Sequence, residues 1–166
     1  MSISTSVVRP DMRPRTEKKQ AIARDERPRT TLSFYRYVRL ADPALFCSAL
    51  YTKLSELDCL GRIYVASEGI NAQMNVPTEN FDTLDVFLQS LPELTGTPYK
   101  IAVEEKDFSS FYKLTIKVRK KIVADGLDDT TFDVTNTGAY LTAAEMNAYI
   151  EDPEAVVVDM RNAYEK

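Results

Sequence analysis

Histidine is absent from this sequence of 166 residues, and there are only two cysteines, Cys47 and Cys59. Zinc sites are built from cysteine and histidine ligands at short, paired spacings, and two isolated cysteines do not provide that pattern. Without histidine, the chain cannot supply a Ser–His or Cys–His nucleophilic pair. We therefore expect no metal site and no hydrolase of these types within this chain.

Long apolar segments are also absent. No run approaches the roughly 20 residues that a membrane-spanning helix needs. The first residues lack the hydrophobic core of a signal peptide. We therefore predict a cytoplasmic protein that keeps its thiols reduced and does not enter a membrane.

Charge is distributed unevenly along the chain. The net charge is −4, yet residues 1–30 carry eight basic and four acidic side chains. We predict that residues 1–29 are a basic arm without regular structure. Such an arm could attract nucleic acid to an otherwise acidic protein, or it could be a solvated tail without a partner.

Residues 30–125 have the pattern of a compact α+β domain. Residues 32–38 alternate and are rich in aromatic side chains, which predicts a half-buried strand. Asp42 as N-cap and Pro43 in the first turn predict a helix, which we expect to end at Gly61. Two strands at 62–67 and 70–76 follow, joined by a tight turn at Glu68 and Gly69.

The second half of this domain repeats the alternation. A second helix is expected from Thr78 to Leu91, and further strands at 99–105 and 111–118. The order β-α-β-β-α-β with one added strand predicts a ferredoxin-like antiparallel sheet that carries both helices on one face.

Residues 126–152 read as a connector, because their polar, turn-prone composition contrasts with the flanking strands. The connector contains a short helix, for which Thr142 and Glu145 provide a capping box. In residues 153–166, the uninterrupted apolar run 155–158 is typical of a strand covered on both faces. We expect it to be the first strand of a second, truncated α/β domain, and to fray or pair with another molecule.

Polar side chains along the predicted hairpin are candidate binding groups. Period two places Asn71 and Gln73 on the sheet face opposite the helices, where amides can read nucleotide edges. Tyr35, Tyr37 or Tyr64 could stack on bases there. The alternative is an ordinary solvated sheet face.

Three adjacent cations, Arg119, Lys120 and Lys121, follow the last strand of the domain. Together with Lys117 on that strand, they could contact the phosphates of a nucleic acid from a semi-rigid platform. A solvated strand end is the alternative.

Four separated motifs carry the most specific information about the family. They are residues 28–35 (PRTTLSFY), 61–73 (GRIYVASEGINAQ), 117–126 (KVRKKIVADG) and 159–165 (DMRNAYE). In this order, they closely resemble the bacterial rhodanese-containing tRNA uridine hydroxylases, in which an acylphosphatase-like, ferredoxin-like domain precedes a rhodanese domain.

The resemblance implies an oxidoreductase that uses molecular oxygen as co-substrate to convert the wobble uridine of tRNA to 5-hydroxyuridine. The cysteine that this family requires would lie beyond Lys166. We therefore expect no catalytic residue and no bound cofactor in this chain, and little activity from it alone. Asp159 and Arg161 would form a structural ion pair at the end of the rhodanese strand. The implied partner is tRNA, with neither DNA nor a membrane.

Other functions remain open at this point. The domain could be a non-catalytic scaffold, for example in a rhodanese-type sulfurtransferase. We do not expect acylphosphatase activity, because the loop at 39–43 lacks glycine and places Asp42 where a phosphate would sit. Cys59 is not expected to be a nucleophile, because it lies after a helix and before a strand, whereas the rhodanese loop has the opposite order.

Overall fold

The computed structural model describes residues 13–103, 111–123, 133, 136 and 138–158. The chain divides into two compact units, residues 1–135 and 136–166, which are described separately. No helix among the described residues has the length and apolar character needed to cross a membrane. The predicted boundaries of the arm, domain, connector and second domain stay predictions.

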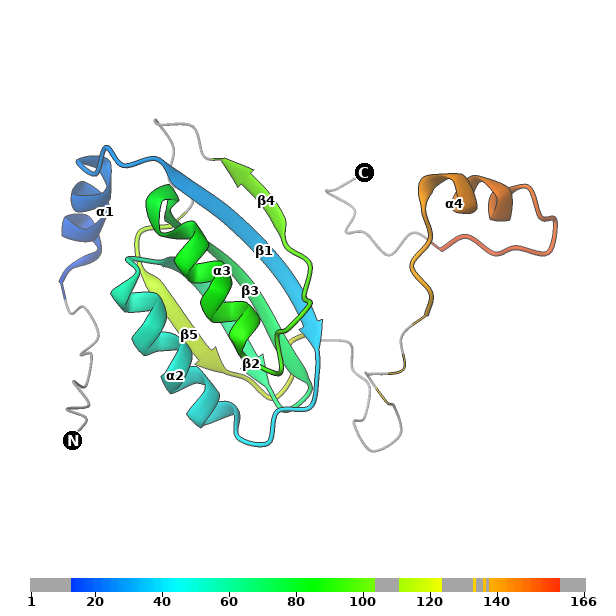
Figure 1. Cartoon of the computed structure of the whole chain (residues 1–166), viewed down its shortest axis with the longest axis horizontal. Helices are drawn as coiled ribbons and strands as arrows, with labels where there is room; N and C mark the ends of the chain where they lie inside the picture. The colour runs from blue at the N-terminus through cyan, green and yellow to red at the C-terminus, as the bar shows by residue number, and fades with distance from the viewer. Residues whose placement is uncertain (1–12, 104–110, 124–132, 134–135, 137, 159–166) are drawn as a thin grey trace. The chain divides into compact units, whose positions relative to one another are not determined.

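Five strands of the first unit form one sheet in the order β4-β1-β3-β2-β5 (Figure 1). Neighbouring strands among β1–β4 pair antiparallel, as predicted for a ferredoxin-like core, but β5 pairs parallel to β2. The expectation of an antiparallel sheet is thus corrected for the added strand. β5 lies at the opposite edge of the sheet from β4 and runs in the opposite direction to it. β2 also runs opposite to β4, so β5 and β2 are parallel. The strands are β1 Arg29–Tyr37, β2 Leu60–Ala66, β3 Gly69–Pro77, β4 Lys100–Val103 and β5 Leu114–Val118.

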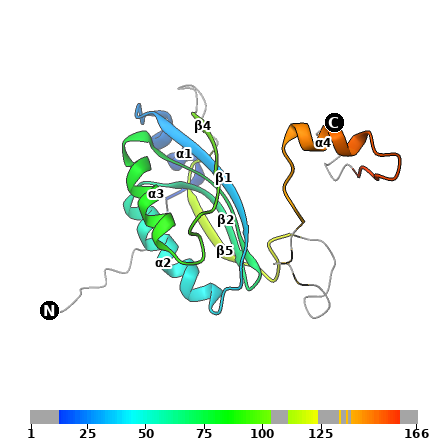
Figure 2. The ribbon, with the colours of Figure 1, turned by 45° about the vertical axis from the view of Figure 1, so that its right-hand side comes forward.

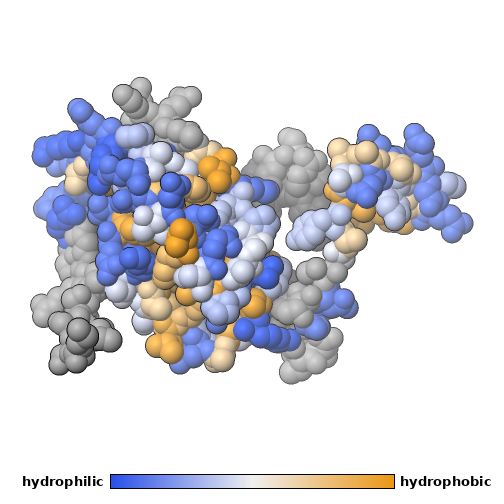
Figure 3. Space-filling model, viewed as in Figure 1, coloured by the Kyte–Doolittle hydropathy of each residue, from blue (hydrophilic) through white to orange (hydrophobic). Residues whose placement is uncertain are grey.

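Two helices cover one face of the sheet, as predicted (Figures 1 and 2). They are α2, Pro43–Glu56, and α3, Phe81–Ser90, which follows the short 3-10 helix η1, Thr78–Asn80. Leu54 of α2 and Leu84 of α3 are fully buried in one core with strand residues such as Ile63. Hydrophobic and hydrophilic residues are interspersed on the outer surface of this side (Figure 3). The core therefore lies between the helices and the sheet, and leaves the opposite sheet face uncovered by them.

Helix α2 begins where the sequence predicted but ends earlier than expected. The Asp42 carboxylate accepts a hydrogen bond from the Leu45 amide at 2.9 Å, which confirms the predicted N-cap. The helix ends at Glu56 rather than at Gly61, and Asp58 makes the turn with a φ of 55°. Gly61 instead lies within β2, where a Cβ would come within 2.5 Å of the Gln73 carbonyl oxygen. A close approach between strands requires this glycine, not a helix end.

A further helix, α1 at Arg15–Ala23, lies within the arm that was expected to lack regular structure. None of its residues is buried. The guanidinium of Arg15 and the ammonium of Lys19 lie 5.3 and 5.8 Å from the centre of the Tyr112 ring, so cation–π contacts link the helix to the domain. Sequence reasoning missed α1 because it relied on the scarcity of apolar residues, although the segment is rich in helix formers.

Among the described residues of the second unit, 143–150 form helix α4, Ala143–Ile150. The predicted capping box is confirmed, since the Thr142 amide donates to the Glu145 carboxylate at 2.7 Å and the Glu145 amide donates to the Thr142 hydroxyl at 3.3 Å. The apolar run at 155–158 is not a strand in this chain, and Val156 is 86% exposed. A strand needs a neighbouring strand to satisfy its backbone N–H and C=O groups, and no described strand pairs with this run. The apolar pattern alone is therefore not enough to form a strand here.

Candidate nucleic-acid interface

Strand pairing assembles a row of polar and aromatic side chains across the uncovered sheet face. The row consists of Tyr35, Asn71, Tyr64 and Lys117, contributed by β1, β3, β2 and β5. The alternate residues Ile70 and Ala72 are fully buried in the core under the helices. Because alternate side chains of a strand point to opposite faces, the row faces away from α2 and α3.

A second row lies one pleat away on the same face. It contains Lys100, Ser33, Gln73, Arg62 and Thr115, one residue from each strand. Gln73 and Arg62 are exposed. The two rows therefore combine two amides with several cations on one surface, which we call the open face.

Arg119 continues the open face beyond the end of β5. Its amide donates to the Val65 carbonyl at 2.8 Å, which prolongs the pairing with β2. Its guanidinium carbon lies 5.1 Å from the centre of the Tyr64 ring. This cation–π contact holds the charge beside the ring and leaves guanidinium donors for an anion.

The segment after Arg119 is held at the open face through Ile122. The Ile122 amide donates to the Glu68 carboxylate at 2.7 Å, and the Ile122 carbonyl accepts from the Tyr35 hydroxyl at 2.8 Å. Glu68 is only 1% exposed, so this contact lies in the interior. Burial raises the pKa of Tyr35, which keeps its hydroxyl protonated as a donor. The arrangement holds the Lys120–Lys121 pair next to the sheet.

The chain matches the family model of the UPF0176 acylphosphatase like domain over residues 29–122. It belongs to this family. The matched segment contains all five strands, α2 and α3, and therefore the whole open face up to Ile122.

Relatives of this UPF0176 domain carry a more specific name. A "tRNA uridine(34) hydroxylase" of Escherichia coli O17:K52:H18 is 49% identical over 149 residues, which are 89% of this chain and 42% of that protein. The protein of the same name from Erwinia tasmaniensis is 48% identical over 150 residues, 90% of this chain and 43% of that protein. These findings confirm the family resemblance seen in the four motifs. The chain spans less than half the length of these relatives.

Among solved structures, the dark-state structure of BlrB, a BLUF protein, aligns with 57% of this chain and 76% of its own. The TM-score is 0.45 and the identity is 17%. This likeness is too distant to bear on function.

The fold places four of the predicted binding residues, Lys117, Asn71, Gln73 and Arg119, on or beside the open face. Lys117 and Asn71 share one row, Gln73 lies in the next, and Arg119 contacts that first row through Tyr64. Lys120 is exposed and Lys121 is half-buried in the segment that follows. Their role in binding stays a prediction. Asp159 and Arg161 lie outside the described residues.

Arg62 was missed by sequence reasoning. It is exposed on the open face, with Gln73 on one side and Thr115 on the other. Period two counted from Tyr64 would have placed it on this face.

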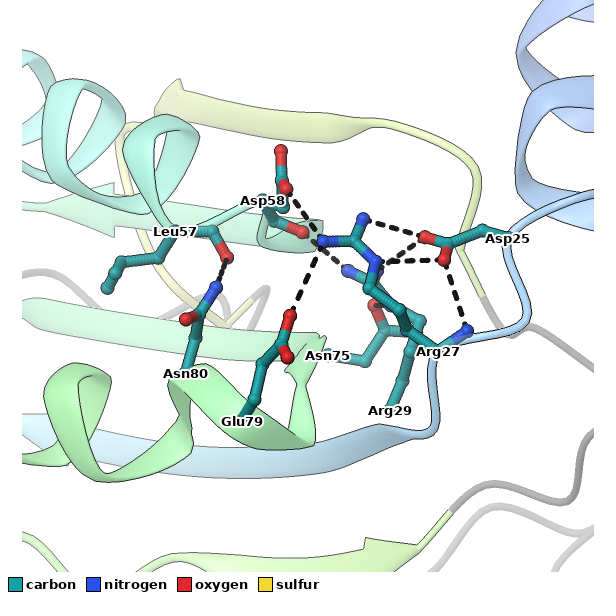
Figure 4. A network of polar contacts seen from close by, with 8 residues as sticks. All are labelled: Asp25, Arg27, Arg29, Leu57, Asp58, Asn75, Glu79 and Asn80. Carbon is teal, nitrogen blue, oxygen red and sulfur yellow. Dashed lines mark hydrogen bonds and ion pairs between the residues drawn. The ribbon is translucent and has the colours of Figure 1, made fainter.

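Arg27 and Arg29, counted as part of a basic arm, belong to a structural network (Figure 4). Arg29 is 6% exposed and donates to the Asn75 side-chain oxygen at 2.8 Å. Arg27 pairs with Asp25 at 2.8 Å and with Asp58 at 3.1 Å. The Arg27 side chain holds the pKa of Asp25 below its ordinary value. These arginines tie the start of β1 to the α2–β2 turn.

Neither of the two cysteines has the lowered pKa of an activated nucleophile. Burial raises the pKa of Cys59 to about 12 and also raises that of Cys47. Both remain thiols at neutral pH, so neither resembles a reactive cysteine. No group of three or more Cys, Asp or Glu suited to a metal is found in the described part of the chain.

The loop between β1 and α2 differs from a phosphate-cradling loop in its contacts. The Asp42 carboxylate is used as the cap of α2, and Arg39 lies 3.6 Å from Asp133. A carboxylate at the helix N-terminus occupies the position that would attract a phosphate. The likeness to acylphosphatase is therefore one of fold.

Proposed function

We propose that this chain is the tRNA-positioning part of an oxygen-dependent hydroxylase that converts the wobble uridine of tRNA to 5-hydroxyuridine. The kinship with proteins named tRNA uridine(34) hydroxylase supports this reaction class. The single observation that carries the binding role is the open face, where Tyr64, Asn71 and Lys117 stand side by side. The protein would act in the cytoplasm on tRNA, with molecular oxygen as co-substrate.

The chemistry of the open face suits RNA in a single-stranded or looped form. The Tyr35 and Tyr37 rings lie 5.9 Å apart and provide aromatic surface against which unstacked bases can lie. Asn71 and Gln73 can donate to and accept from base edges. Lys117 and Arg119 can neutralise phosphates. The chain would thus bind and orient tRNA, and the reacting cysteine would belong to the part of the enzyme outside it.

A binding experiment with unmodified tRNA tests this role. We expect Lys117→Ala to weaken binding and to reduce the slope of log K against log salt by about 0.7 to 0.9, the value for one lost phosphate contact. Lys53→Ala is the matched control, because Lys53 lies on α2, on the covered side of the sheet. Binding would be measured by fluorescence anisotropy at several salt concentrations.

Equal affinities and slopes for both variants and the parent chain would contradict binding through the open face. That outcome would favour the scaffold alternative, in which the domain packs against the rest of the enzyme and does not contact RNA.

A further inference from the structure

A cavity of about 570 Å³ lies at the β5 edge of the sheet and shares only Thr115 with the rows of the open face. It is bounded by α1, the second half of α2, the turn into β2 and the edge strand β5. Pockets of about 300 to 1,000 Å³ are the usual size for small-molecule sites. The cavity is therefore large enough to hold a nucleotide.

Basic residues outnumber acidic ones in the lining, although the whole chain carries a net charge of −4. Five basic side chains line the cavity, and the acidic ones among the described lining residues are Asp25 and Asp58. Both carboxylates are already engaged, since Asp25 lies 2.8 Å from Arg27 and 3.5 Å from Arg29, and Asp58 lies 3.1 Å from Arg27. The basic residues are Arg13, Lys18, Arg27, Arg29 and Lys113.

This excess of positive charge is anchored in the protein. The guanidinium of Arg29 is held by Asn75 and Asp25 and is almost inaccessible from outside. With five basic and two acidic residues among its described lining, the cavity has a positive balance of charge that favours an anion. Tyr51 also lines the space and provides aromatic surface beside the charges, whereas the Tyr112 ring, which lines it too, already contacts Arg15 and Lys19.

We propose that this cavity binds a nucleotide through its phosphate group, with the base against Tyr51. The phosphate could belong to a free nucleotide or to a nucleotide within RNA. The proposal does not depend on tRNA binding at the open face, because of the residues in the two open-face rows only Thr115 lines the cavity.

The test is a titration of the 166-residue chain with uridine 5′-monophosphate, followed through the backbone amides by NMR. We expect saturable shifts in residues 58–60 and 112–116, weaker binding of inorganic phosphate, and no saturation with uridine. Lys113→Glu and Lys18→Glu should each weaken nucleotide binding about tenfold. Lys53→Glu, with the same charge change outside the cavity, should leave it unaltered.

Absence of saturation by about 1 mM nucleotide, a very weak affinity, would overturn the proposal. So would equal weakening by Lys53→Glu, or a lack of effect of both cavity variants in chains whose spectra show an intact fold.

A competition experiment distinguishes a free nucleotide from a nucleotide within RNA as the source of the phosphate. Displacement of the nucleotide by tRNA would assign the site to an RNA phosphate, whereas its retention would assign the site to a free nucleotide. Lys117→Ala should change tRNA binding at the open face without changing these shifts.

Discussion

Arg29 shows how one charged side chain can be tolerated in the interior. Its guanidinium donates to Asn75 and faces Asp25, and burial lowers its pKa without removing its charge. Buried charges persist when they are paired and hydrogen-bonded, as here. Cys59 lies in the same region, but it stays uncharged, because burial raises its pKa and favours the neutral thiol.

The raised pKa of Cys59 predicts a loss of stability at high pH. The pKa rises from its ordinary value of 9.0 to about 12 in the folded chain. Above about pH 9 the unfolded thiol ionises while the folded one keeps its proton, so the free energy of unfolding should fall with pH. The contribution approaches ~1.4 kcal/mol per pH unit and ends near the folded pKa.

Urea denaturation between pH 8 and 10.5 would measure this slope. Cys59→Ala should flatten it relative to the parent chain, and Cys47→Ala, which removes a less buried thiol, should flatten it less. Identical slopes in all three chains would contradict the prediction.

At the scale of elements, local signals and period two explain most of what is observed. The alternation in β3 places Ile70 and Ala72 in the core and Asn71 on the open face, as its sequence pattern predicts. The capped start of α2 is equally local, because Asp42 reaches an amide only three residues away. Such contacts form wherever the helix forms, independently of the rest of the fold.

Removal of the α2 cap should destabilise the first unit. Asp42→Ala deletes the acceptor for the Leu45 amide and should lower the free energy of unfolding by about 1 kcal/mol. Asp42→Asn keeps a capping oxygen and should change it by only a few tenths. Equal midpoints of urea denaturation for Asp42→Ala and the parent chain would show that the cap is dispensable.

At the scale of the whole first unit, the open face depends on contacts between distant segments. β5 joins β2 in parallel, and Tyr35 and Glu68 hold Ile122 beyond the end of β5. These contacts link residues that are far apart in sequence, and they hold the cations that follow β5 beside the open face.

Tyr35→Phe tests this link while it retains the aromatic ring. Loss of the hydrogen bond to Ile122 should weaken the attachment by about 1 kcal/mol and raise amide exchange at residues 119–123 about fivefold. Tyr64→Phe removes a hydroxyl for which no hydrogen bond is found within the described residues, so it serves as the control. Unchanged exchange in Tyr35→Phe would mean that other contacts hold the segment.

The candidate site was only partly predictable from sequence. Asn71, Gln73 and Lys117 follow from strand periodicity, and Arg62 could have been found in the same way. The contact of Arg119 with Tyr64 could not, because it depends on the parallel pairing of β5 with β2. Helix α1 and the cavity beside it were also missed, since cation–π contacts and clustered charges leave no periodic pattern.

The sequence by itself determined the two-layer α+β domain, the caps of α2 and α4, the polar face of β3 and the family. These features depend on periodicity, on side chains that reach backbone groups within one turn, or on motifs read directly. Only the tertiary structure decided the direction of β5, the burial of Arg29 and the attachment of Ile122. Each of these depends on contacts between residues far apart in the chain, and local propensity does not encode which of the possible distant partners will meet.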